Sequence, residues 1–248
     1  LSPLLANETT LEAITPHDAT WYKQHRIAIH LDHSVASINK TAKKVTCNNG
    51  NTFSYHALVF ATGSRSSIPA LEGIDNPAVI GFRSMTDVDA MTARLHHLEH
   101  ATVIGAGLLG VEAAVGLRSR GVRVTLMHRN SVLMNRQLDE TASKLLEHEL
   151  IARGIEVITG ANPQRLVSTP NGDLNAVELI KDGVLLTTPT QLVVFATGII
   201  PNTELATSAG ILTGRGICVN SMMETSESDV YSLGECSEFD GTTYGLVA

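Results

Sequence analysis

Residues 101–110 read Ala-Thr-Val-Ile-Gly-Ala-Gly-Leu-Leu-Gly, and this stretch decides the fold. A short apolar run suited to a buried strand comes first, and three glycines follow in the spacing G-x-G-x-x-G. Glycines so placed allow a tight turn, close approach of the backbone to a pyrophosphate, and close packing of the next helix. The N-terminus of that helix adds about half a positive charge. The residues predicted to bind a dinucleotide are Gly105, Ala106, Gly107, Leu108, Leu109 and Gly110.

The chain around this loop alternates between strand and helix patterns. Residues 111–120 have helical composition, 122–127 and 155–158 suit strands, and 137–153 place leucines at helical spacing before Gly154. We expect the stripe from Leu138 to Leu150, Leu145 included, to face the core. A further helix is expected earlier in the chain, over 84–99, capped by Ser84 or Thr86. Strand, glycine turn, helix, strand, helix and strand make a doubly wound α/β unit.

An internal sequence repeat predicts a second, related domain. Residues 57–64 read Ala-Leu-Val-Phe-Ala-Thr-Gly-Ser and residues 191–198 read Gln-Leu-Val-Val-Phe-Ala-Thr-Gly. Each fits a buried parallel strand and follows hairpins with Asn-Gly or Asp-Gly turns. In the later copy the glycine loop lies well before Ala196, and the same spacing counted back from Ala61 falls before residue 1. We therefore expect the first of two Rossmann-like domains to lack its opening strand and phosphate loop.

Composition excludes several function classes. The chain has 248 residues, with 18 Lys and Arg against 25 Asp and Glu, so its net charge of −7 argues against binding nucleic acid or an anionic membrane surface. Its apolar runs are far shorter than the roughly 18 residues that span a bilayer, and no leader pattern is present. Three scattered cysteines without a CxxC motif exclude a disulfide framework and a cysteine-built zinc site. We expect no metal and a cytoplasmic location.

The residues after the second strand bear on nucleotide choice. An acidic residue usually stands there when the ribose 2′-hydroxyl of NAD is bound. Here the chain has His128 and Arg129, with Arg136 close behind. Arg129 could pair with a 2′-phosphate and favour NADPH, or it could stack on adenine or remain solvated. Glu112, two residues beyond Gly110, either complements the helix dipole or faces the nicotinamide as a catalytic residue.

The motifs occur in the order found in the pyridine nucleotide-disulfide reductase-like flavoproteins, which the chain resembles over its whole length. They are Ala61-Thr-Gly-Ser64, the glycine loop, Ala196-Thr-Gly-Ile-Ile-Pro-Asn202 and Val230-Tyr-Ser-Leu-Gly-Glu235. Residues 1–6, 133–139, 234–236 and 244–248 are similar, more narrowly, to the flavin reductase part of the large subunit of assimilatory NAD(P)H nitrite reductases.

The resemblance implies two three-layer domains with antiparallel meanders. An FAD domain would comprise residues 1–95 and 216–248, and an NAD(P)H domain residues 96–215. Residues 196–199 (Ala196, Thr197, Gly198, Ile199) would flank the nicotinamide. Ser2 and Pro3 stand where disulfide reductases of the family have redox cysteines, which disfavours that activity. The residues that the resemblance assigns to FAD are Val35, Ala61, Thr62, Gly63, Gly234, Glu235, Tyr244, Gly245 and Leu246.

The function implied is hydride transfer from NAD(P)H to FAD, with electrons passed onward. In nitrite reductases they reach siroheme and iron–sulfur centres, which would belong to a longer parent polypeptide, and nitrite becomes ammonia. One rival is a stand-alone NAD(P)H-dependent rubredoxin or ferredoxin reductase or NADH oxidase. Another is a non-catalytic, truncated nucleotide-binding segment. We expect the chain alone to hold little FAD and to be inactive, and a homodimer is left open.

Overall fold

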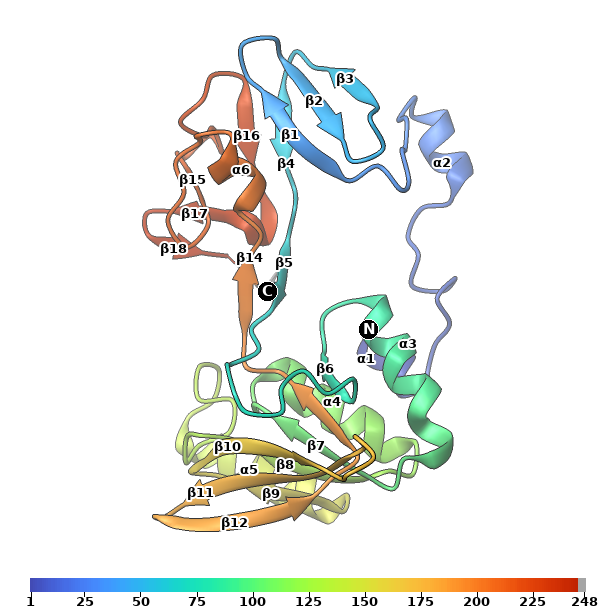
Figure 1. Ribbon diagram of the computed structural model, residues 1–248, viewed down its shortest axis with the longest axis vertical. Helices are drawn as coiled ribbons and strands as arrows, with labels where there is room; N and C mark the ends of the chain where they lie inside the picture. Colours follow the sequence, from blue (N-terminus) through green and yellow to red (C-terminus); the bar gives the residue numbers. More distant parts are fainter. Residues whose placement is uncertain (245–248) are drawn as a thin grey trace. The chain divides into compact units, whose positions relative to one another are not determined.

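The computed structural model describes residues 1–244, which form two compact units. Unit 1 comprises Leu1–Thr15 and Ser66–Gly198, and unit 2 comprises Pro16–Arg65 with the residues from Ile199 onward (Figure 1). The elements of unit 1 are α1 (Ser2–Leu5), β6 (Val79–Gly81), α3 (Met85–Arg94), the 3₁₀ turn η1 (Leu95–His97), β7 (His100–Ile104), α4 (Leu108–Ser119), β8 (Arg123–Met127), α5 (Glu140–Ala152), β9 (Ile155–Ile158), β10 (Ala161–Ser168), β11 (Leu174–Lys181), β12 (Val184–Pro189) and β13 (Leu192–Phe195).

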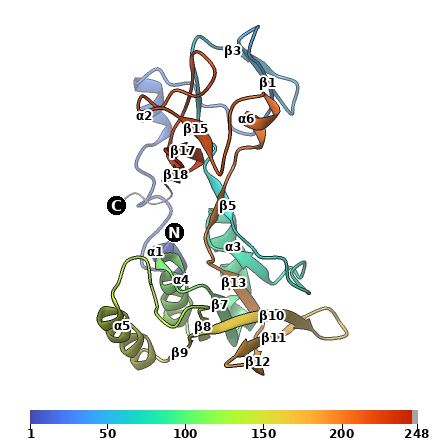
Figure 2. The same cartoon turned by 90° about the vertical axis from the view of Figure 1, so that its left-hand side faces the viewer.

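Unit 1 has three layers around a parallel sheet with strand order β6-β13-β7-β8-β9. Helices α4 and α5 lie on one side of this sheet, and the antiparallel meander β10-β11-β12 lies on the other (Figure 2). This confirms the predicted Rossmann-like α/β fold with an antiparallel meander. Asp182 and Gly183, both at positive φ, form the predicted turn between β11 and β12.

Alternating residues of the parallel strands bury both faces of the sheet. Val103 and Val194 belong to the apolar cluster shared with the helices, whereas Ile104 and Phe195 belong to the cluster shared with the meander. Because both faces are covered, the strands consist of apolar runs without polar alternation. The packing therefore explains why residues 192–195 form a uniformly buried strand.

Three helix predictions need correction at their ends. Helix α4 starts at Leu108, three residues before the predicted residue 111, because Gly107 is its N-cap. Helix α5 starts at Glu140, three residues later than the predicted residue 137, because the side chain of Asp139 accepts a hydrogen bond from the backbone N–H of Ala142 and caps the helix. Its stripe is narrower than predicted, since Leu150 is buried but Leu145 is 66% exposed. Helix α3 begins as predicted after Ser84, which forms a capping box with Asp87, but ends at Arg94.

Unit 2 is built from short strands around a smaller core of Phe60, Ala206, Ile211, Ile217, Val230 and Cys236. Its strand β4 (Leu58–Phe60) pairs in parallel with β16 (Val230–Ser232). Strand β5 (Ser64–Ser66) pairs with β14 where the chain passes the unit boundary. The other elements are α2 (Ala19–Gln24), β1 (Val35–Asn39), β2 (Lys44–Cys47), β3 (Thr52–Ser54), β4 (Leu58–Phe60), β14 (Ile199–Pro201), α6 (Glu204–Ser208), β15 (Ile217–Val219), β16 (Val230–Ser232), the 3₁₀ turn η2 (Gly234–Cys236), β17 (Ser237–Phe239) and β18 (Thr242–Thr243).

The unit boundaries differ from the domain ranges expected from the resemblance, 1–95, 96–215 and 216–248. Residues 1–15 and 66–95 belong to unit 1, and residues 199–215 belong to unit 2. The fully buried side chain of Leu5 and the partly buried Leu4 pack in the core shared by α3 and α4, which explains the first difference. Residues 205–211 join the unit 2 core through Ala206 and Ile211, which explains the last.

A bilayer-spanning helix is missing from the part of the chain that the structure describes, because no described helix is both long and apolar enough. The three cysteines, Cys47, Cys218 and Cys236, are all unpaired.

Candidate functional site

The predicted dinucleotide loop follows β7 and leads into α4. Gly105 has φ +107°, and a Cβ placed there would lie 2.4 Å from the carbonyl oxygen of Ala196. A Cβ at Gly110 would lie 1.7 Å from the carbonyl oxygen of Gly105. Both positions therefore need glycine, the first for its turn and its closeness to the neighbouring loop, the second for close packing of the helix.

Packing within the protein itself does not require glycine at position 107. A Cβ there would meet no protein atom within 4 Å, so the backbone faces open space. Gly107 is also the N-cap of α4, and among the described residues no side chain caps this helix. The first N–H groups of a helix have no partner within the helix. The loop thus presents backbone donors and the positive end of a helix dipole to any anion that occupies the space.

The sheet topology places this loop at a switch point. Strand β7 lies at the centre of the sheet, with β8 and β9 on one side and β13 and β6 on the other. The strand order therefore reverses between β7 and β13. Parallel α/β sheets bind ligands in the crevice that such a reversal opens beyond the carboxyl ends of the strands. Ala196, at the end of β13, approaches Gly105 there and donates its backbone N–H to the carbonyl of Ile104 at 2.8 Å.

Two residues from beyond β8 hold Ala106 in place. The backbone N–H of Ala106 donates to Nδ1 of His128 at 3.2 Å, and the backbone N–H of Met134 donates to the carbonyl of Ala106 at 2.8 Å. Burial lowers the pKa of His128, a hydrogen bond with Asn135 raises it, and the charge of Arg129 lowers it. The net lowering keeps the imidazole neutral near pH 7, as an Nδ1 that accepts a hydrogen bond requires. Sequence reasoning missed Met134, whose positive φ of 46° gave no sequence signal.

Glu112 on α4 contacts a residue from the start of the chain. The hydroxyl of Ser2 donates to a carboxylate oxygen of Glu112, and both residues belong to unit 1. The α1 segment lies against α4, where a Cβ at Gly116 would come within 3.3 Å of the Leu5 side chain. The small residue in α4 thus lets α1 approach and brings Ser2 to Glu112.

The FAD candidates in unit 2 fall in two places. Val35 and Thr62 both line a hollow of about 590 Å³ that also borders β4 and α6. The hydroxyl of Ser64 donates to the carboxylate of Glu235 at 2.8 Å, next to Gly234 with its φ of +74°. Glu235 is not among the residues that line the hollow beside Val35. Tyr244 is 57% exposed, and Gly245 and Leu246 lie outside the described residues.

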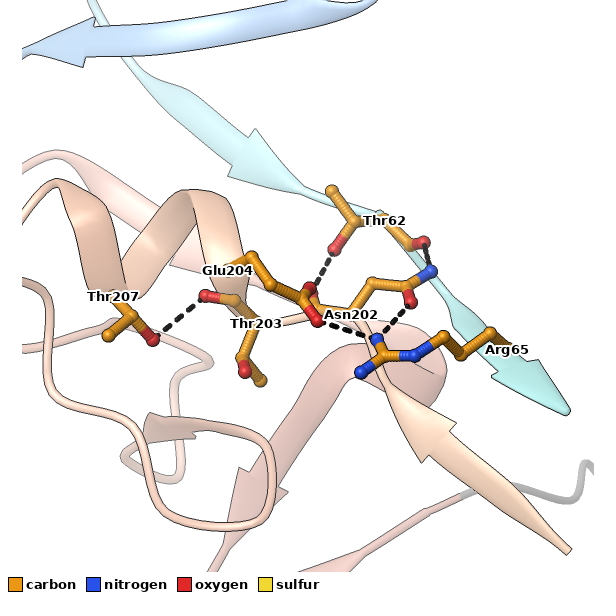
Figure 3. A network of polar contacts seen from close by, with 6 residues as sticks. All are labelled: Thr62, Arg65, Asn202, Thr203, Glu204 and Thr207. Atoms are coloured by element: carbon orange, nitrogen blue, oxygen red, sulfur yellow. Dashed lines mark hydrogen bonds and ion pairs between the residues drawn. The ribbon is translucent and has the colours of Figure 1, made fainter. Parts of the chain in front are cut away.

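A polar network holds the segment that contains Thr62 (Figure 3). The side chain of Asn202 donates to the carbonyl of Thr62 at 2.8 Å, and the hydroxyl of Thr62 donates to the carbonyl of Asn202 at 2.8 Å. Arg65 donates to the Asn202 side chain and forms an ion pair with Glu204 at 2.6 Å. The backbone N–H of Glu204 and, to a smaller extent, Arg65 lower the pKa of Glu204. Asn202 ends the motif that starts at Ala196, but its hydrogen bonds with Thr62 could be seen only in the structure.

Two of the residues expected to bind the nucleotide are arginines that follow β8. Arg129 and Arg136 are both exposed, and neither forms an ion pair among the described residues. No group of three His, Cys, Asp or Glu side chains within residues 1–244 could hold a metal ion.

Comparison with known proteins gives one family. The family model described as pyridine nucleotide-disulphide oxidoreductase matches residues 2–247. The chain is 40% identical to the assimilatory nitrate reductase electron transfer subunit of Bacillus subtilis (strain 168) over its full length, which is 32% of that protein. It is 38% identical to the nitrite reductase [NAD(P)H] of the same organism, of which it covers 30%. The chain therefore spans about a third of the length of these relatives.

Solved structures agree in fold. The chain superposes on a ferredoxin reductase from Rhodopseudomonas palustris with a TM-score of 0.87 and 26% identity, over 96% of this chain and 59% of that one. It also matches a NADH:rubredoxin oxidoreductase from Clostridium acetobutylicum with a TM-score of 0.79 and 25% identity, over 99% of this chain and 60% of that one.

Proposed function

Because the chain belongs to the pyridine nucleotide-disulphide oxidoreductase family, we propose that it binds NAD(P)H, passes its hydride to FAD and directs the electrons onward. One observation carries the proposal. The Gly105–Gly110 loop lies at the switch point of a parallel sheet, where Gly107 opens to free space and α4 has no side-chain cap. That arrangement suits a pyrophosphate.

The residues of unit 1 would bind and orient the nucleotide. The N–H groups that open α4 would donate hydrogen bonds to the pyrophosphate, while His128 and Met134 hold Ala106 and so fix the loop. Glu112, held by Ser2, would face the nicotinamide end. A carboxylate held by one hydroxyl has oxygen lone pairs left to orient an amide N–H. Residues 196–199 would flank the nicotinamide.

FAD fits the residues of unit 2 in part. The hollow beside Val35 and Thr62 suits an adenosine, and the Ser64–Glu235 pair, with Gly234, offers oxygen acceptors to a polyol chain. Ala61, Gly63 and Tyr244 are further candidates. The described residues of unit 2 contain no glycine loop that opens a helix. The diphosphate of FAD would therefore find no helix N-terminus of that kind among them. When bound, FAD accepts the hydride and releases electrons to the next carrier.

In a longer protein that contains this chain, the electrons would serve the reduction of nitrite to ammonia in the cytoplasm. The similarity to a nitrate reductase electron transfer subunit and to a nitrite reductase supports this role. Siroheme and iron–sulfur centres would then lie in other parts of that protein. The acceptor would be a downstream redox domain, with a homodimer left open.

Two other functions have support of their own. The similarity to a ferredoxin reductase and to a NADH:rubredoxin oxidoreductase favours a reductase that serves a separate small redox protein, with a NADH oxidase as its variant. The absence of a phosphate loop from the described residues of unit 2 favours a nucleotide-binding segment without catalysis of its own.

A pair of substitutions at Gly107 tests the nucleotide site on the chain itself. Asp and Asn both suit an N-cap at the observed φ of −80°, so both variants should fold at least as stably as the native chain. Both side chains would enter the open space, and the charge of Asp would repel a pyrophosphate. We expect Gly107→Asp to bind NADPH at least roughly tenfold more weakly than Gly107→Asn in calorimetric titrations. Equal, native affinity in both variants would place the nucleotide elsewhere.

A spectrum of the longer protein tests the electron path. The visible spectrum would be recorded anaerobically before and after NADPH, and again with NADH. A flavin band that bleaches, together with a siroheme band that shifts with nitrite, supports the nitrite reductase role. Bleaching without any haem-type band supports the separate reductase, and no bleaching contradicts hydride transfer to FAD.

A further inference from the structure

The carboxyl end of β8 lies beside the glycine loop. Ile104 of β7 pairs with Met127 of β8, and the N–H of Gly105 donates to the carbonyl of Met127 at 2.8 Å. In dinucleotide sites the side chains that follow this strand contact the adenosine ribose. A carboxylate there binds the 2′-hydroxyl of NADH, and an arginine accommodates the 2′-phosphate of NADPH.

No carboxylate stands at this end of β8. Residues 128–138 contain neither Asp nor Glu. The first acidic residue is Asp139, and its side chain is engaged as the N-cap of α5. The position directly after the strand holds His128, whose Nδ1 accepts the N–H of Ala106 and whose imidazole is therefore uncharged. Nothing in this segment would repel a phosphate dianion.

Arg129 is the first cation after the strand, and its charge is uncommitted. Three other arginines of unit 1, Arg123, Arg153 and Arg165, form ion pairs with glutamates, whereas Arg129 has none among residues 1–244. The chain on both sides of it is tied to the glycine loop, since His128, the preceding residue, and Met134, five residues later, each hydrogen bond to Ala106. The backbone of Arg129 is thus held close to the loop while its side chain remains exposed.

We propose that Arg129 binds the ribose 2′-phosphate and makes NADPH the preferred hydride donor of this chain. This inference rests on the proposed function, because it assigns the adenosine end of the same nucleotide to the same loop. A guanidinium forms two parallel hydrogen bonds with a phosphate, and such charge-assisted bonds are about twice as strong as neutral ones. The expected preference is roughly 10- to 100-fold.

The test measures binding of NADP⁺ and NAD⁺ to the purified chain by calorimetry, so that no flavin or turnover is needed. The native chain should bind NADP⁺ at least tenfold more tightly. Arg129→Ala should lose most of that ratio while its NAD⁺ affinity stays within about twofold, and Arg129→Lys should keep part of it. Arg136→Ala tests the other exposed arginine of the segment and should keep the ratio. Arg123→Ala removes an exposed arginine at the opposite end of β8 and is the matched control, with an unchanged ratio expected.

The outcomes separate this proposal from the broader one. Equal binding of both nucleotides by the native chain, or an unchanged ratio in Arg129→Ala, overturns the role of Arg129 and leaves the nucleotide site standing. Loss of the ratio in Arg136→Ala alone assigns the 2′-phosphate to Arg136 and also overturns it. If neither nucleotide binds the native chain, the proposed function fails together with this inference.

Discussion

Val59 and Val194 occupy the same place in two copies of one sequence pattern, yet their surroundings differ. Val194 is fully buried in β13, which has β6 on one edge and β7 on the other. Val59 is 50% exposed in β4, which pairs with β16 on one edge and with no other strand among residues 1–244. The two segments are similar in sequence, so the difference in burial comes from their surroundings. Strand β13 has a second neighbouring strand and covered faces, and β4 does not.

The two copies nevertheless end in the same way. In unit 2 the hydroxyl of Thr62 donates to the carbonyl of Asn202, and the N–H of Asn202 donates to the carbonyl of Gly63 at 2.9 Å. In unit 1 the hydroxyl of Thr197 donates to the carbonyl of Ser67, and the N–H of Ser67 donates to the carbonyl of Gly198 at 2.9 Å. Each Ala-Thr-Gly is thus tied to the residue five positions after the threonine of the other copy.

The comparison teaches what each part of the repeated pattern does. The Thr-Gly ending forms, in both units, a pair of hydrogen bonds to the segment that passes beside it, and we call this arrangement a crossing. Burial of the preceding strand depends on its neighbours, which the pattern itself does not supply. We infer that the copies share a folding motif and that unit 1 adds to it the strand and glycine loop to which we assign the proposed nucleotide site.

The largest expected effect comes from placing a charge at each of the paired valines. Val194→Asp would bury an unpaired carboxylate and should destabilise unit 1 by about 4 kcal/mol or more, if it folds at all. Val59→Asp should cost less than about 1 kcal/mol, because its side chain can reach water. Circular dichroism melts of the two variants measure this difference.

Equal costs at the two valines would break the comparison. They would mean that the side chain of Val59 is covered in solution as fully as that of Val194. Val194→Ala, which leaves a cavity and no charge, provides a milder variant that should still fold and cost about 2 kcal/mol.

A smaller difference is expected at two glycines with positive φ. Gly105→Ala would force a Cβ to within 2.4 Å of the Ala196 carbonyl, whereas a Cβ at Gly63 would meet nothing within 4 Å. Gly63→Ala should therefore cost only about 1 kcal/mol for its φ of 61°. Gly105→Ala should cost about 2–3 kcal/mol and also weaken binding of NADP⁺. Unfolding in urea measures the costs, and a cheap Gly105→Ala would show that the loop and residue 196 can move apart.

Much of unit 1 could be predicted from sequence because its signals are local. The glycine spacing, the apolar strands and the Asp-Gly turn each act within a few residues, and the structure confirms the fold that they predict. The clamps on Ala106 could not be predicted, since His128 and Met134 reach it from more than 20 positions away along the chain. Membership of residues 1–15 in unit 1 depends likewise on the packing of Leu5 against α4, a contact between distant segments.

The smallest expected effect tests whether the two crossings are equivalent. Thr62→Val and Thr197→Val each keep the shape of the side chain and remove the hydroxyl that donates to the opposite carbonyl. Each should cost about 1 kcal/mol, the usual net contribution of one hydrogen bond. Thr187→Val, at an exposed position of β12, is the control and should change stability by less than about 0.5 kcal/mol. If the two crossings are equivalent, the two losses agree within error. A loss at Thr62 alone would mean that Asn202 and its contacts with Arg65, which have no counterpart at Ser67, stabilise the crossing in unit 2.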